Sequence, residues 1–344
     1  AYTTRGFYFH LAFGRLVGAI PRSVIAASAT RGYWLRLMDA EVRSLVYLAL
    51  GKWFTYLGLV GLTGAVCLRQ LLGSVGIEPR VYPTVERLLA SLAVYASGLV
   101  IVAVVARLYA QTFSVFGLDE PVTLELLRVV GFESRWGSQW LLHAAVAILV
   151  GMATMMVRSR VRLGWNALAV LTVVLWLTLP LTGHAMSFST PEFLWAIQVS
   201  HGLAAGAWIG TLFALLLVGS FLCESDFRSG SVCFAGLVRR FSPRAVIAVM
   251  VLFATGTITS WFYLDSFEHL WSDSYGKTLL LKLFFVISTG AVGFYNWRFL
   301  APRLGDVAGS RRLFSSIRAE LVCGLLLLAA TAVLVHLAVP AEMG

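Results

Sequence analysis

Residues 164–183 read GWNALAVLTVVLWLTLPLTG, a stretch of 20 residues without Asp, Glu, Lys or Arg. At a rise of about 1.5 Å per residue, a helix of about 20 residues crosses the roughly 30 Å hydrocarbon core of a bilayer. This stretch therefore predicts a membrane-spanning helix.

The same pattern recurs along the chain. Eight segments qualify as spans: 47–68, 90–110, 138–157, 164–183, 193–222, 244–264, 277–299 and 319–338. The apolar runs are continuous rather than alternating, and in lipid a helix satisfies its own backbone hydrogen bonds. The sequence therefore predicts an all-α polytopic transmembrane helix bundle over residues 46–340.

The composition agrees with a surface that faces lipid. The chain has 344 residues, of which 59% are hydrophobic and only 13% are charged, whereas soluble domains average about 25% charged residues. The net charge of +10 does not indicate nucleic-acid binding, because the arginines lie in short loops between apolar spans. The four cysteines form no CxxC pair and are expected to act as small apolar side chains.

The loops predict the orientation of the chain in the membrane. Positive charge is concentrated after the third, fifth and seventh spans, at Arg158, Arg160, Arg162, Arg228, Arg239, Arg240, Arg244, Arg298, Arg303, Arg311, Arg312 and Arg318. The positive-inside rule places these loops in the cytoplasm. With eight spans, both termini are then expected on the outer, periplasmic side.

Residues 1–45 do not fit this scheme, because they carry six arginines on the side predicted to be outside. Arg15, Pro21 and Arg22 break the apolar character of residues 7–30, so a ninth span is not expected. We interpret residues 1–45 as an interfacial, amphipathic N-terminal extension. The alternative is an arm that docks on other subunits of a membrane complex.

The histidines fall on the outer side of this topology, and two of them form the strongest candidate site. His184 closes the fourth span, and His201 lies about ten residues, or ~15 Å, into the next helix. Imidazole and thioether ligands suit copper, particularly copper(I), and Met186 is two residues from His184. His184, His201 and Met186 are therefore predicted as a metal site.

Two further residues are candidates for this site. His143 lies about two turns into the third span, and Lys282 lies inside the seventh. Ionisable groups inside a membrane are costly and tend to be functional. An ion pair between Lys282 and an acidic loop residue is the alternative to a role in shaping a cation path. No phosphate-binding loop, dinucleotide fingerprint or HExxH motif is present, and nothing in the sequence argues for catalysis.

Several short motifs, taken in order, resemble the copper resistance protein D (CopD) family. They are GHA (183–185), HGLAAGAWIG (201–210), FSP (241–243), ATG (254–256), YGKTLLLKL (275–283), YNWR (295–298), PRL (302–304) and RAEL (318–321). The resemblance covers about residues 46–340. Near the start of the first span, the chain has Lys52-Trp53 where the family often has a histidine.

The resemblance implies an eight-span protein of the bacterial inner membrane that takes part in copper uptake or tolerance. A periplasmic copper-binding protein of the CopC type is the partner it implies, and a copper ion is the expected ligand. Two alternatives stay open. One is a structural or accessory subunit of a larger membrane complex built on the same fold. The other is a b-type haem-binding electron-transfer subunit, in which His143 pairs with His184 or His201.

Overall fold

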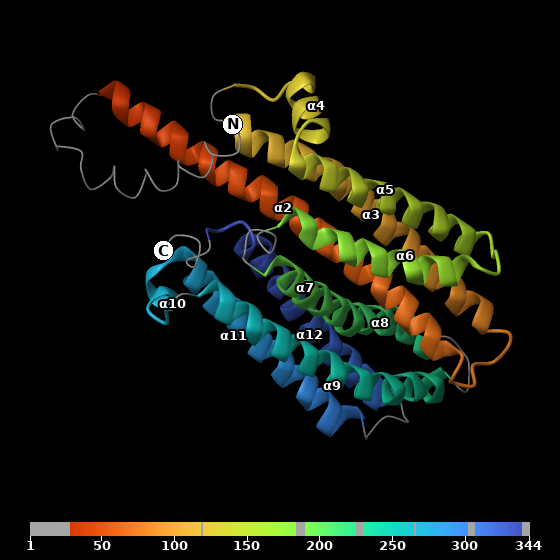
Figure 1. Ribbon diagram of the computed structural model, residues 1–344. Coiled ribbons are helices and arrows are strands. Elements are labelled where there is room, and N and C mark those ends of the chain that lie inside the picture. Colours follow the sequence, from red (N-terminus) through yellow and green to blue (C-terminus); the bar gives the residue numbers. More distant parts are fainter. Residues whose placement is uncertain are drawn as a thin grey trace.

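The computed structural model describes residues 28–117, 120–183, 190–224, 230–264, 266–301 and 307–338. Within these ranges the chain is helical and contains no strand, which confirms the all-α prediction (Figure 1). Eight of the helices described are long and apolar enough to cross a membrane.

The long helices pack side by side and alternate in direction (Figure 1). In chain order the elements are α2 (Ser28–Leu72), α3 (Tyr82–Phe116), α4 (Leu124–Phe132), α5 (Arg135–Arg158), α6 (Gly164–Thr178), the 3-10 turn η2 (Leu179–Thr182), α7 (Pro191–Ala205), the π-helical turn η4 (Gly206–Gly210), α8 (Thr211–Glu224), α9 (Gly230–Tyr263), α10 (His269–Ser272), α11 (Ser274–Tyr295), the π-helical turn η5 (Asn296–Leu300) and α12 (Val307–Leu334). The elements α7, η4 and α8 together form one span.

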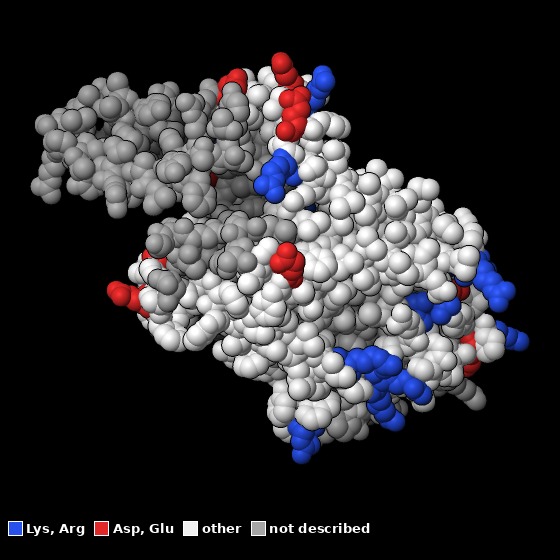
Figure 2. All heavy atoms as spheres, viewed as in Figure 1, with Lys and Arg blue, Asp and Glu red and all other residues white. Residues whose placement is uncertain are grey.

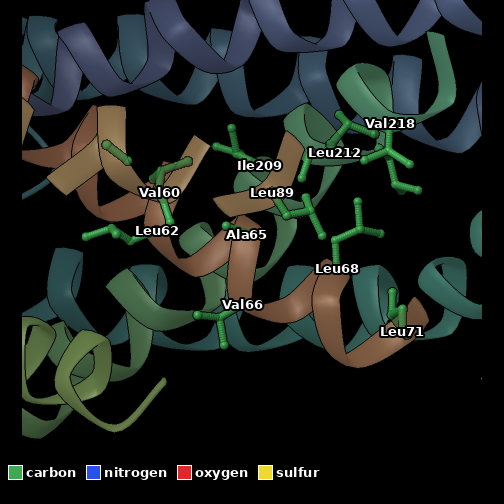
Figure 3. Packing of buried hydrophobic residues seen from close by; sticks show 14 of the residues in the cluster. Val60, Leu62, Ala65, Val66, Leu68, Leu71, Leu89, Ile209, Leu212 and Val218 are labelled. Atoms are coloured by element: carbon green, nitrogen blue, oxygen red, sulfur yellow. The ribbon is translucent and has the colours of Figure 1, made fainter. Parts of the chain in front are cut away.

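Helix α2 is central to the packing. It contacts α3, α6, η4, α8 and α12, and its apolar side chains form the middle of the main core cluster (Figure 3). Leu62, Ala65 and Leu68 of α2 are fully buried there, together with Leu89 of α3. Helix α2 therefore packs against helices from both halves of the chain.

The closest approach in the bundle is between α2 and η4. A Cβ atom added to Gly64 would lie 2.0 Å from the carbonyl oxygen of Gly210, and one added to Gly210 would lie 2.0 Å from that of Val60. No side chain fits at either position, which is why small residues are needed here. The small residues that follow His201 in the chain thus permit α2 and η4 to pack closely.

The exterior of the bundle is apolar. Met250 and Phe253 of α9 and Ile287 of α11 are all more than half exposed, as expected for side chains that face lipid. Lysine and arginine gather at one end of the visible face, where α2 and α8 end, and α4 and α10 lie at the other end (Figure 2). The two ends of the bundle therefore differ in charge.

Most of the spans are longer than predicted from the sequence. The first was expected at 47–68 and is Ala40–Leu72, within a helix that begins at Ser28. The sixth was expected at 244–264 and is Gly230–Tyr263, a helix that continues through Pro243. Charged side chains at a helix end can reach the membrane surface, so they do not mark where the helix stops.

Residues 28–45 thus belong to the same helix as the first span, and residues 1–27 lie outside the described residues. The interfacial or docking role of residues 1–45 stays a prediction.

Candidate functional site

His201 lies on α7 and is held by a threonine of α9. Its Nδ1 is 2.9 Å from Oγ1 of Thr255, and the Thr255 hydroxyl donates to the carbonyl of Val251 at 2.6 Å. Since that hydroxyl already donates its hydrogen, it accepts the Nδ1–H of His201. The proton of the neutral ring is therefore on Nδ1, and Nε2 carries a lone pair.

His143 repeats this arrangement on α5. Its Nδ1 is 2.8 Å from Oγ1 of Thr178 on α6, and the Thr178 hydroxyl donates to the carbonyl of Leu175 at 3.0 Å. The His143 side chain has no solvent exposure, and its Nε2 makes no hydrogen bond to any part of the chain that the structure describes.

A histidine that binds a metal through one nitrogen commonly donates the other ring N–H to a neighbouring acceptor, which fixes the tautomer and the ring orientation. Both His143 and His201 have this support. Among the described residues, however, no three side chains of His, Cys, Asp or Glu converge as a metal site. Copper bound at either histidine would therefore have fewer than three such ligands from the described residues, unless residues outside these ranges also bind it.

Two basic side chains are buried close to His143. Lys52 of α2 is 6% exposed and Arg107 of α3 is 7% exposed, and both act electrostatically on His143. The guanidinium Nη2 of Arg107 donates to Oγ1 of Thr182 at 2.7 Å. A Cβ on Gly51 would lie 2.9 Å from Cγ of Arg107, so the missing side chain of Gly51 makes room for the stem of Arg107.

Lys282 of α11 lies close enough to the other histidine, His201, for its positive charge to act on it electrostatically. None of the acidic residues within the described ranges forms an ion pair with it. The ion pair that the sequence analysis considered is therefore not found in this part of the chain, and Lys282 instead makes the surroundings of His201 more positive.

Polar contacts also connect α7 to the helices on either side of it. Gln198 Nε2 donates to the hydroxyl of Tyr263 at 2.6 Å, which joins α7 to α9. Trp195 Nε1 donates to the carbonyl of Leu177 at 2.9 Å, which joins α7 to α6. These bonds fix α7, the helix that carries His201, between its two neighbours.

The other two predicted ligands, His184 and Met186, lie outside the described residues. Whether they approach His201 stays a prediction. His269 lies on α10, where its Nδ1 is 2.6 Å from Oδ2 of Asp273, so its polar contact is with α10's own neighbour and not with His201.

Sequence analysis assigned no role to Glu320, a buried carboxyl on α12. The side chain is 3% exposed. Asn296, in the π-helical turn η5, donates to its Oε2 at 2.8 Å. Such π-helical turns are often found at functional sites.

Comparison with known proteins gives two family matches that together span most of the chain. Residues 38–190 match the family described as copper resistance protein D-like, N-terminal domain. Residues 235–334 match the one described as copper resistance protein D. The chain belongs to the copper resistance protein D family. As a member of this family with eight apolar spans, it is a multi-pass protein of the inner membrane.

A curated relative of this family member is the copper transport protein CutJ of Bacillus subtilis (strain 168). The two are 30% identical over 224 residues, which are 63% of this chain and 39% of the relative. The chain therefore spans well under half of the relative that it matches. No solved structure matches the chain. The haem alternative receives no support from these matches.

The sequence contained a signal for the residues that were not singled out as a site. Lys52, Arg107 and Glu320 are charged residues inside long apolar spans, where each is costly. Thr178 and Thr255 gave no such signal, because threonine is common in membrane helices. Only the packing of α5 on α6 and of α7 on α9 shows that these hydroxyls meet histidines.

Proposed function

We propose that this chain handles copper and moves it across the membrane, with His201 as a ligand on the path. The observation that carries the proposal is the hydrogen bond from His201 Nδ1–H to Thr255, which leaves the Nε2 lone pair for a ligand. The family and the name of the CutJ relative indicate the metal.

The proposed entry is the end of the bundle at which α4 and α10 lie. The opposite end carries the arginine-rich loops, which the positive-inside rule assigns to the cytoplasm. His143 and His201 both lie in the half of the bundle nearer to α4 and α10. Copper would then be taken up from the periplasmic side, where a copper-binding protein of the CopC type could deliver it.

His184 and Met186 complete the proposed entry site. His184 follows η2 by two residues, and α7 begins at Pro191. His184 and Met186 therefore belong to the connection between two elements of the site: α6, which carries Thr178, and α7, which carries His201. A thioether and imidazoles form a soft ligand set that suits copper(I). Lys282, which is electrostatically close to His201, would weaken cation binding there and so help the metal to leave.

The test begins with copper(I) stoichiometry and affinity of the purified, detergent-solubilised protein. The variants are His201→Ala, the double variant His184→Ala/His201→Ala, and His269→Ala as a matched control on the surface. We expect the parent and the control to hold copper(I) and the double variant to lose it. No copper in the parent, with the fold intact, would overturn the proposal and favour a structural subunit.

Transport is measured in proteoliposomes that enclose a coloured copper(I) chelator. Uptake in the parent and in His269→Ala, with loss of uptake in His201→Ala, supports transport. Equal uptake in the parent and in the double variant would show that copper does not pass these residues.

A further inference from the structure

Lys52 and Arg107 form a buried pair of like charges. They lie on the adjacent helices α2 and α3, are 6% and 7% exposed, and repel each other electrostatically. Burying a charge is costly unless an opposite charge compensates it. Among the described residues, no Asp or Glu forms an ion pair with either side chain. The pair therefore needs a negative charge that this part of the chain does not supply.

The groups around this pair are mostly hydrogen-bond donors. The guanidinium of Arg107 has five N–H donors, and one hydrogen bond is found for it within the described ranges, from Nη2 to Thr182. The ammonium of Lys52 lies 5.9 Å from the centre of the Tyr56 ring, a weak contact. No hydrogen bond or ion pair to this ammonium is found among the residues that the structure describes. The neighbouring Trp53 also has a buried Nε1–H for which the described part of the chain offers no partner. The Nε2 of His143 is a neutral acceptor nearby, so what this part of the chain lacks is a negatively charged one.

We propose that Lys52 and Arg107 bind a small carboxylate anion inside the membrane domain. A planar guanidinium presents parallel N–H groups that match the two oxygens of a carboxylate. The ammonium of Lys52 supplies the second positive charge. The hydrogen bond to Thr182 fixes the guanidinium, and the stem of Arg107 packs against the backbone at Gly51. The site is therefore formed by buried, packed side chains rather than by mobile surface groups.

The anion would also affect His143, on which both cations act. If copper passes His143, which rests on the function proposed above, a bound carboxylate lowers the repulsion that a copper cation meets there. Binding of the anion and of copper would then favour each other reciprocally. The anion site itself does not depend on copper, so it can be tested alone.

The experiment follows the thermal unfolding of the full chain in detergent while acetate replaces chloride at constant ionic strength. We expect acetate to raise the midpoint of the parent by roughly 2 °C or more, since a ligand that binds only the folded state stabilises it. Arg107→Met and Lys52→Met should lose this response. Arg87→Met, an exposed position on the same helix, should keep it.

A built-in carboxylate gives a second test that does not require removal of a buried cation. Thr182 already contacts Arg107, so Thr182→Asp places a carboxylate beside the guanidinium, and Thr182→Asn is its neutral match. We expect Thr182→Asp to unfold at a higher temperature than Thr182→Asn without acetate, and to gain nothing from acetate. The proposal is overturned if acetate acts equally on the parent and on Arg107→Met, or if Thr182→Asp is no more stable than Thr182→Asn.

Discussion

Replacement of Thr255 by valine removes the acceptor of the His201 Nδ1–H while keeping the shape of the side chain. Thr255 is 6% exposed and its Oγ1 lies 2.9 Å from Nδ1, so no bulk water replaces the lost bond. Loss of such an outer partner typically weakens metal binding about 10- to 100-fold, which corresponds to about 1.4–2.8 kcal/mol. We expect a loss of copper(I) affinity in that range.

The assay is competition for copper(I) between the purified protein and a coloured chelator of known affinity. Two variants serve as controls. Thr255→Ser keeps the hydroxyl and should bind copper within about threefold of the parent. Thr257→Val makes the same chemical change on the same helix, but at an exposed threonine whose hydroxyl donates to the carbonyl of Phe253. It should bind copper as the parent does.

Two results would refute this reasoning in different ways. If Thr255→Val binds copper like the parent while His201→Ala does not, His201 is a ligand but Thr255 does not orient it. If neither variant changes the affinity, His201 is not a ligand of the metal. An equal loss in Thr255→Val and Thr257→Val would point to a general disturbance of α9.

Three further predictions concern the packing and the buried charges. Gly210→Ala should lower the apparent midpoint of thermal unfolding by several degrees, because its Cβ would lie 2.0 Å from the carbonyl oxygen of Val60 and overpacking costs about 1–3 kcal/mol. Glu320→Leu should lower the same midpoint more than Glu320→Gln, since leucine leaves the buried amide that donates to this carboxyl unsatisfied, at about 1–3 kcal/mol. Lys282→Met should strengthen copper(I) binding about fivefold in the chelator assay, because it removes a cation that acts on His201.

Each of these has an outcome that would contradict it. An unchanged midpoint in the glycine variant would mean that α2 and η4 can separate at no cost. Equal effects of leucine and glutamine at position 320 would show that the carboxyl only fills space. Weaker copper binding in Lys282→Met would mean that the lysine holds the site together rather than opposing the cation.

Much of the fold is predictable from local sequence. The stretch 164–183 is a span because it has no charge and sufficient length, whatever surrounds it, and the structure places a span at Gly164–Thr182. Boundaries were less predictable where a helix leaves the hydrocarbon. The sixth span was expected to begin after Pro243, yet α9 continues through this residue. The arginines before the expected span do not mark a helix end, because their side chains can extend to the membrane surface while the backbone stays helical.

The candidate site was predictable only in part. Histidines and a lysine inside apolar spans stand out because such residues are costly in lipid, and His143, His201 and Lys282 were identified in this way. Their hydrogen-bond partners were not, since a threonine hydroxyl that bonds its own helix is unremarkable in sequence. The prediction for His184 and Met186 remains to be tested.

The sequence by itself thus determined the number of spans, the all-α class and the family, because span length, charge and short motifs are local properties of the chain. Only the tertiary structure decided which side chains face one another. The rotation of each helix depends on contacts such as that between Gly64 and Gly210, which join segments far apart in sequence. That rotation brings Lys52 near Arg107 and Thr255 to His201, because a side chain's neighbours are set by the face it occupies rather than by its position in the chain.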